Sequence, residues 1–183
     1  STAVKDALGN ITYYEYDALG NMTKVADANG NYISYVYDAN GMVEKVVYPD
    51  NTFIAYTYNK NGMKTSETNA EGKITLFDYD SNNRLTKVTD ALGNITEYTY
   101  DSSGDLIVQK DANGNETNFE YDCMGRLIKR TLPMGMFETF TYDYLGNVLS
   151  HTSFKGETTK FEYKDGKLVK KIYPDQSFES YTY

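Results

Sequence analysis

The chain has 183 residues and a formal net charge of −8, which disfavours nucleic acid or an anionic membrane surface as a partner, since both require clustered Lys and Arg. The single cysteine, Cys123, excludes an internal disulfide, and no apolar run approaches the roughly 20 residues of a membrane-spanning helix. With 19 Tyr, 14 Gly and only 3 Pro, the composition is typical of strands and turns and predicts no helix.

A tyrosine recurs every 21 residues from Tyr16 to Tyr163, and we call it the marker tyrosine. It is followed in most copies by Asp and, four residues after the tyrosine, by Gly. A fixed period of this length indicates a repeat array, in which each unit contacts mainly its neighbours. We therefore predict one continuous array over residues 1–183, with about eight repeats, as a segment of a longer protein. The positions that define the pattern are Tyr16, Asp17, Gly20, Tyr37, Asp38, Gly41, Tyr79, Asp80, Tyr100, Asp101, Gly104, Tyr121, Asp122, Gly125, Tyr142, Asp143 and Gly146.

Each repeat contains two positions where Gly predominates, represented by Gly72 and Gly104. One copy of each series has Asn instead, at Asn51 and Asn83. Gly and Asn share the ability to adopt a left-handed backbone, so each position is predicted to be a turn. The runs of about seven residues between turns are strands, which makes each repeat a β-hairpin joined to the next by a second turn. The segment 164–166 is one residue shorter than its equivalents and is predicted to be a loop.

Side chains alternate along the predicted strand 94–100, which places Thr96, Tyr98 and Tyr100 on one face. The residue two before the marker tyrosine is aromatic in every copy, so we call this face the ring face and predict rows of offset ring contacts along it. The residue six after the marker should pair with it and share the ring face. The lysine found two positions later in several repeats, such as Lys45, is expected on the same face. The predicted fold is an all-β, curved and spiralling antiparallel sheet of tandem hairpins.

The Tyr-Asp pairs, the Gly four residues after each tyrosine and the Leu-like residue beyond it resemble the YD repeat, also called the Rhs repeat, over essentially the whole chain. Tyr58-Asn59, Tyr163-Lys164 and Asn83 depart from the pattern in single units. The family comprises large secreted or surface bacterial proteins, including polymorphic toxins and toxin-complex C components, and animal teneurins carry a similar region. The resemblance implies a β-sheet shell that encloses or presents a C-terminal toxin or effector. It also implies a secreted or cell-surface location, with the rest of a longer chain as the main partner.

Three features could carry chemistry, and each has a structural explanation. Segments 27–31 and 111–115 place Asp, Asn and Asn at alternate positions, as calcium loops do, but Asp and Asn also favour such turns by bonding to the backbone. His151 occupies a variable strand position, which is a poor place for a general base. The acids that precede the marker tyrosines, such as Glu120, repeat on the face opposite the rings, where they are expected to be solvated. We predict no metal, no cofactor and no enzymatic activity, and find no repeat with a polar cluster that the others lack.

Two alternatives to a structural shell remain open from the sequence. Phe53 and Phe137 lie on the face away from the aromatic rows, as do Tyr13, Tyr32 and Phe178, and such rings could stack on sugars in a carbohydrate-binding or adhesion module. Strands at the ends of the array could instead pair between copies to form a filament.

Overall fold

The computed structural model describes residues 2–183, and every regular element in that range is a β-strand. The chain divides into two compact units, unit 1 ending at Ile95 and unit 2 beginning at Thr96. The strands of unit 1 are β1 (Thr2–Lys5), β2 (Ile11–Tyr16), β3 (Met22–Ala26), β4 (Tyr32–Tyr37), β5 (Val43–Val47), β6 (Phe53–Tyr58), β7 (Lys64–Thr68), β8 (Ile74–Tyr79) and β9 (Leu85–Thr89). From the boundary onward follow β10 (Ile95–Tyr100), β11 (Leu106–Lys110), β12 (Glu116–Tyr121), β13 (Leu127–Thr131), β14 (Phe137–Tyr142), β15 (Val148–Thr152), β16 (Thr158–Lys164), β17 (Lys167–Ile172) and β18 (Phe178–Ser180).

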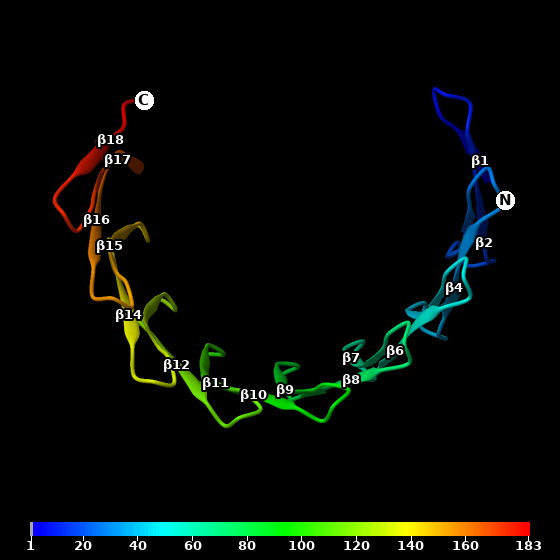
Figure 1. The fold of residues 1–183 in the computed structure, drawn as a ribbon, viewed down its shortest axis with the longest axis horizontal. Coiled ribbons are helices and arrows are strands. Elements are labelled where there is room, and N and C mark those ends of the chain that lie inside the picture. The colour runs from blue at the N-terminus through cyan, green and yellow to red at the C-terminus, as the bar shows by residue number, and fades with distance from the viewer. Residues whose placement is uncertain (1) are drawn as a thin grey trace. The chain divides into compact units, whose positions relative to one another are not determined.

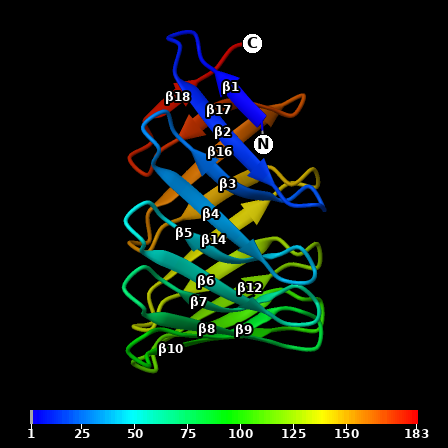
Figure 2. The ribbon, with the colours of Figure 1, turned by 90° about the vertical axis from the view of Figure 1, so that its right-hand side faces the viewer.

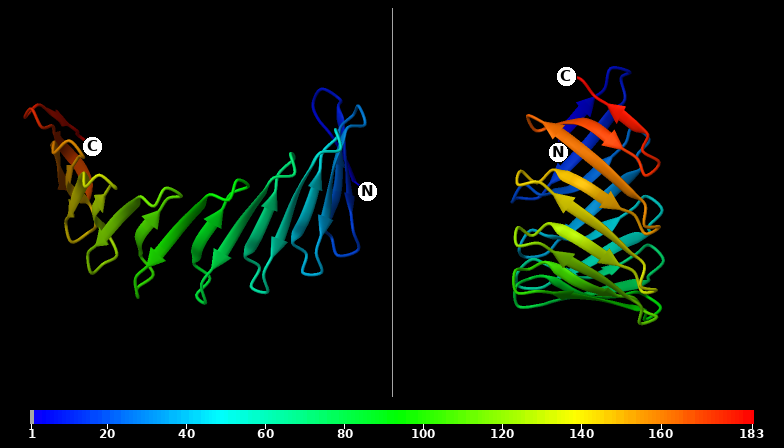
Figure 3. Two further views of the ribbon diagram at one scale, coloured as in Figure 1. Left: turned by 60° about the horizontal axis from the view of Figure 1, so that its bottom comes forward. Right: turned by 90° about the vertical axis from the view of Figure 1, so that its left-hand side faces the viewer.

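Within each unit, every strand pairs antiparallel with the strand that follows it in the chain. Each unit taken alone is therefore a twisted strip of hairpins laid side by side (Figure 1). The turns gather along the two long edges of the strip, as Figure 2 shows for the strands β2 to β8 of unit 1 and Figure 3 for β14 to β17 of unit 2. The all-β fold and its hairpin order confirm the prediction from the sequence, whereas a single continuous array over 1–183 stays a prediction.

The turns have the geometry that the Gly and Asn positions predicted. In a representative turn, the Gly114 amide donates to the Asp111 carbonyl (3.0 Å) and the Asp111 amide donates to the Asn115 carbonyl (2.9 Å), with φ of +83° at Gly114. This is a three-residue hairpin loop that closes on a left-handed residue. Asn51 and Asn83 have φ of 66° and 63°, as expected.

Two turns differ from the predicted pattern. A third turn, besides those of Asn51 and Asn83, also lacks Gly at the left-handed position. Gln176 occupies it with φ of 68°, which the preference for Gly and Asn did not predict. At the shortened loop, Lys164 pairs directly with Lys167, and the two residues between them have positive φ, 52° at Asp165 and 74° at Gly166. Two consecutive left-handed residues form the tight hairpin turn that matches strand twist, so the missing residue changes the turn type and leaves the strands paired.

A bulge follows each marker tyrosine and overturns the predicted placement of the lysines. Tyr37 pairs with Val43 on the ring face as predicted, but Val36 pairs with Lys45, so Glu44 is an extra residue in β5. Because paired residues share a face, Lys45 lies with Val36 on the face opposite the rings. Regular alternation from Val43 would have placed it with the rings. We call the opposite face the lysine face.

The aromatic side chains share the ring face, but few of them touch one another. Tyr56 and Tyr58 form one such ring contact, with centroids 6.5 Å apart. Equivalent positions in successive repeats are separated by two strand spacings, about 9.6 Å, which exceeds the range of about 4.5–7 Å for ring pairs. The aromatic residues do form rows on the ring face, but the prediction that neighbouring rings contact one another along each row is wrong. Aliphatic residues of the intervening strands lie between the rings, as Val46 does opposite Tyr35.

No hydrophobic side chain among residues 2–183 is fully buried. The accessible surface is 12276 Å², whereas a globular monomer of 20.8 kDa exposes about 8,900 Å². The strips therefore have no enclosed core of their own, and their stability comes from contacts between adjacent strands.

Candidate functional site

In several repeats the hydroxyl of the marker tyrosine joins one hairpin to the previous one. Backbone pairing between β5 and β6 ends at Lys45 and Ala55, so Val43 lies beyond the last backbone pair. The Tyr58 hydroxyl donates a hydrogen bond of 2.8 Å to the Val43 carbonyl. The side chain thus supplies the donor that the backbone no longer provides, and a half-buried carbonyl is satisfied.

The same contact recurs in both units, always to the carbonyl 15 residues earlier. Burial raises the pKa of Tyr37, Tyr58, Tyr121 and Tyr142, so these phenols stay protonated and available as donors. We call this contact the tyrosine clasp. Further clasps join Tyr37 with Met22 (2.7 Å), Tyr79 with Lys64 (2.8 Å), Tyr121 with Leu106 (3.0 Å) and Tyr142 with Leu127 (2.7 Å).

The aspartates that open the turns are occupied by their own loops. Asp27 Oδ1 accepts from the amides of Asn29 and Asn31, each at 2.9 Å, and its Oδ2 accepts from the Asn31 side chain at 3.0 Å. Asp111 makes the equivalent three bonds at 2.9 Å. The side-chain bond from the Asn is the leading reason why the pKa of both carboxyl groups is lowered. Residues 2–183 hold no group of three acidic, His or Cys side chains suited to a metal ion. The calcium-like spacing is thus explained by turn closure.

At one edge of unit 2, Arg126 connects neighbouring hairpins. It pairs with the Asp122 carboxylate at 2.7 Å, donates to the Asp143 carbonyl at 2.7 Å, and lies over the Tyr142 ring at 4.7 Å. The Arg126 guanidinium of one repeat therefore contacts the Tyr142-Asp143 pair of the next repeat. This contact was not predicted, because Tyr142 and Asp143 lie 16 and 17 residues from Arg126 in the sequence.

The rings considered for sugar stacking lie on the lysine face as predicted, and four of them, Tyr32, Phe53, Phe137 and Phe178, have a lysine ammonium over the ring. The distance from Nζ to the ring centroid is 4.0 Å for Lys45 over Phe53 and 5.3 Å for Lys129 over Phe137. Phe53 and Phe137 are 37% and 49% exposed. The cation–π partner of the lysine is thus a ring on the lysine face, and not the marker tyrosine. Lys24 over Tyr32 and Lys170 over Phe178 repeat the arrangement at 4.2 Å and 4.6 Å.

One repeat of unit 2 contains a polar cluster that the sequence interpretation missed. Glu138, only 8% exposed on the ring face, binds Arg130 at 2.6 Å through one carboxylate oxygen and His151 Nε2 at 2.9 Å through the other. The His151 ring stacks on Phe140 with centroids 4.6 Å apart. The expectation that no repeat carries a distinct polar cluster was therefore wrong. The signal was available: Glu138 occupies a position that is Thr in most repeats, such as Thr117.

The geometry of this cluster favours a structural role. Both Glu138 oxygens already have a partner, Arg130 on one and His151 Nε2 on the other, so neither is positioned as a free base. Lys64 forms a simpler example on the ring face of unit 1, where it pairs with Glu67 at 2.6 Å and lies over the Phe77 ring at 4.8 Å. The hydrogen bond to Glu67 is the main reason why the pKa of Lys64 is raised. Ionic pairs thus replace aliphatic residues at a few ring-face positions.

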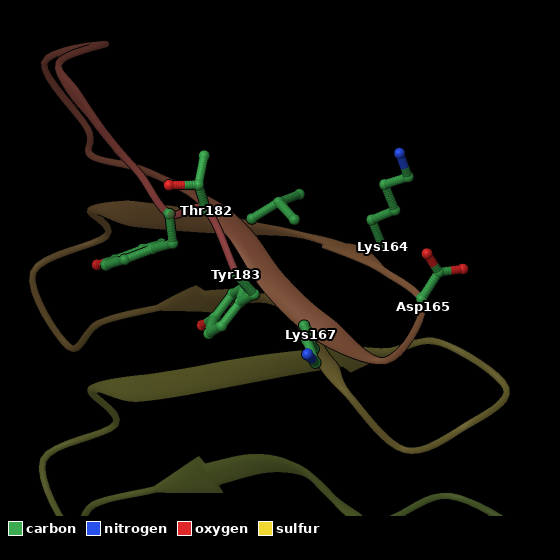
Figure 4. A pocket seen from close by; sticks show the side chains of 7 residues that line it. Lys164, Asp165, Lys167, Thr182 and Tyr183 are labelled. Carbon is green, nitrogen blue, oxygen red and sulfur yellow. The ribbon is translucent and has the colours of Figure 1, made fainter.

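Open notches lie between successive hairpins, and each is lined by equivalent positions of the repeat. Figure 4 shows one of about 350 Å³, where Lys164, Asp165 and Lys167 of a turn face Thr182 and Tyr183. Notches of about 430 and 550 Å³ combine equivalent turn and strand residues around Asn59 and Asp101. Since the notch recurs with different side chains, it is a feature of hairpin packing and not a unique cavity. Cys123 lies exposed at the rim of one copy.

Comparison with known proteins agrees with this architecture. The model of the Teneurin YD-shell family matches residues 15–183. The structure of TcdB2-TccC3 without its hypervariable C-terminal region matches with a TM-score of 0.70 and 21% identity, over 90% of this chain and 10% of that chain. The TcdB2-TccC3-TEV structure matches with a TM-score of 0.71 and 21% identity, over 92% and 10%. The Tc holotoxin pore of Photorhabdus luminescens matches with a TM-score of 0.64 and 17% identity, over 88% and 12%.

No curated protein matches the chain significantly. The chain spans about a tenth of the length of the first two solved chains that it matches. Across residues 2–183, no helix is long and apolar enough to span a bilayer. At this level of identity the solved structures establish a shared fold, and the family model covers most of the sequence. The chain therefore belongs to the Teneurin YD-shell family.

Proposed function

We propose that this chain is a structural wall module of a large secreted or cell-surface bacterial Rhs or YD-repeat protein. In this role its hairpins form part of a β-sheet shell that encloses or presents a C-terminal toxin or effector domain. The proposal extends to the absence of catalysis: the module builds a container and performs no reaction itself.

The tyrosine clasp is the observation that carries this proposal. Each clasp uses a carbonyl of one hairpin and a hydroxyl of the next, so a hairpin that carries a clasp docks the hairpin that follows it. Such a contact can be repeated for any number of units, which suits a wall and gives no unique reaction centre. The Glu138 cluster is consistent with this role, because both oxygens of its carboxylate are already bonded to neighbouring side chains. The match to parts of Tc toxin proteins supports a shell within a longer chain.

Limited proteolysis of the parent protein tests the proposal. We expect a C-terminal domain inside the shell to be cleaved at least tenfold more slowly in the parent than when it is expressed alone. Equal cleavage rates would contradict enclosure and favour presentation at the surface. A parent protein whose C-terminal domain keeps its solubility, protection and activity after deletion of residues 1–183 would contradict the structural role altogether.

A carbohydrate-binding or adhesion module is a second candidate, favoured by the exposed rings of the lysine face. Phe53 and Phe137 keep 37% and 49% of their surface accessible, and each is itself paired with a residue of the preceding strand. Glycan-array binding that is lost in Phe53→Ala or Phe137→Ala, without loss of fold, would support this candidate.

A further inference from the structure

The lysine face of unit 1 carries an open patch centred on Lys45 and Phe53. The Lys45 ammonium lies 4.0 Å from the centre of the Phe53 ring, on the adjacent strand. Val36, directly opposite Lys45, is 47% exposed. A cation, an aromatic ring and an aliphatic side chain thus occur together on three neighbouring strands.

The charge of Lys45 is not neutralised, in contrast to that of its counterpart in unit 2. Lys129 pairs with the Glu120 carboxylate at 2.8 Å. Val36 occupies the position of Glu120 in the repeat of Lys45, and within residues 2–183 no acidic side chain forms an ion pair with Lys45. Even Glu44, its neighbour in the chain, is not paired with it. The two lysine and phenylalanine pairs therefore differ in whether the cation is available to a ligand.

The residues that surround the two lysine and phenylalanine pairs also differ, being less polar around Lys45 and Phe53. Around Lys45 and Phe53 the paired strands place small or aliphatic residues, namely Ser34, Val47 and Ala55. Around Lys129 and Phe137 the equivalent residues are Asn118, Thr131 and Thr139. The patch in unit 1 is therefore less polar than its counterpart, with the Ser34 hydroxyl and one unpaired ammonium as its polar groups.

We infer that this patch binds an acidic saccharide through the carboxylate of a uronic acid. The carboxylate meets an ammonium that the Phe53 ring already holds in place, so little side-chain freedom is lost on binding. The C–H face of the sugar ring lies on Val36 and on the exposed part of Phe53. Both edges of β5 are paired along the patch, which leaves no backbone donors for an added peptide strand. This inference deepens the glycan-binding candidate and rests on it, and it is independent of the wall role.

Amide chemical-shift titration of the intact 183-residue chain tests the inference at low ionic strength, where an exposed ion pair is least screened. The probe is hexagalacturonic acid, with neutral maltohexaose and a polyglutamate hexamer as controls. We expect shifts confined to β4, β5 and β6 with the acidic sugar, and weaker ones or none with the controls. Lys45→Gln should weaken binding at least fivefold.

A reciprocal exchange uses the natural difference between the two repeats. Val36→Glu copies the acid of the unit 2 repeat and should also weaken binding at least fivefold, whereas Glu120→Val should produce new shifts around Phe137. Neither change introduces a residue foreign to that strand position, and circular dichroism checks the fold. Equal binding of maltohexaose would overturn the role of charge and leave the glycan-binding candidate standing. Absence of any sugar binding would overturn both the acidic-saccharide site and the glycan-binding candidate. Equal binding of polyglutamate would overturn the assigned site. Unchanged binding of the acidic sugar in Val36→Glu or Lys45→Gln would overturn it as well.

Discussion

Replacement of Gly72 by Val should destabilise the protein through the backbone alone. Gly72 has φ of +77° in the turn between β7 and β8, and a Cβ built on it would meet no atom within 4 Å. Steric clash with surrounding side chains therefore contributes nothing. A β-branched residue forced into the left-handed region costs about 1–3 kcal/mol.

The same position offers a matched control. Asn51 occupies the equivalent site one repeat earlier with φ of 66°, so Gly72→Asn should be tolerated better than Gly72→Val by at least about 1 kcal/mol. Thr99→Val, at an exposed strand position, controls for the added apolar surface. Neither control forces a β-branched side chain into a left-handed turn.

Urea unfolding followed by tyrosine fluorescence and circular dichroism measures these differences, because the chain contains 19 Tyr and no Trp. Hydrogen exchange in β7 and β8 locates the effect, since repeat proteins can lose structure in one region before the rest. If Gly72→Val is no more destabilising than Thr99→Val, the turn does not require a left-handed residue and the assignment of both Gly series fails.

Three further changes test the contacts between hairpins. Tyr58→Phe removes the bond to the Val43 carbonyl and should cost about 0.5–1.5 kcal/mol in urea unfolding; no loss would mean that water replaces the clasp. The bond from the Asn115 side chain lowers the pKa of Asp111 below its ordinary 3.8. The ionised carboxylate therefore stabilises the fold above about pH 4, and this stabilisation is lost as pH falls through the folded pKa. In an acid titration, Asp111→Asn should lose less free energy of unfolding than the unmodified chain. Glu138→Gln should cost about 1–2 kcal/mol, less than for a fully buried pair because Arg130 and His151 are partly exposed, and an unchanged midpoint would show that the cluster is not stabilising.

The features that the sequence predicted are those set by local chemistry. A left-handed turn depends on the residue at one position, and Gly72 or Asn51 shows this directly. Alternation along β10 depends only on the pleat, so Thr96, Tyr98 and Tyr100 could be assigned to one face. The family resemblance depends on the same local pattern, which is why it extends over the whole array.

The missed features depend on how one strand meets the next. The bulge at Glu44 is not marked by any special residue, and it reverses the face of Lys45. The clasp between Tyr58 and Val43 joins atoms that pairing rules for strands do not consider, because a side chain replaces a backbone donor. The cluster at Glu138 required the register between β13, β14 and β15 before its three side chains could be placed together.

The bulge and the clasp are parts of one arrangement, which explains why tyrosine marks the repeat. In β5 the extra residue Glu44 separates Val43 from the ladder to β6, which ends at Lys45 and Ala55. The Val43 carbonyl then needs a donor from a side chain that ends on the ring face of β6. Phenylalanine would fill the same volume but has no donor, which accounts for tyrosine at the marker position, while either ring occurs two residues earlier, as in Tyr56 and Phe77.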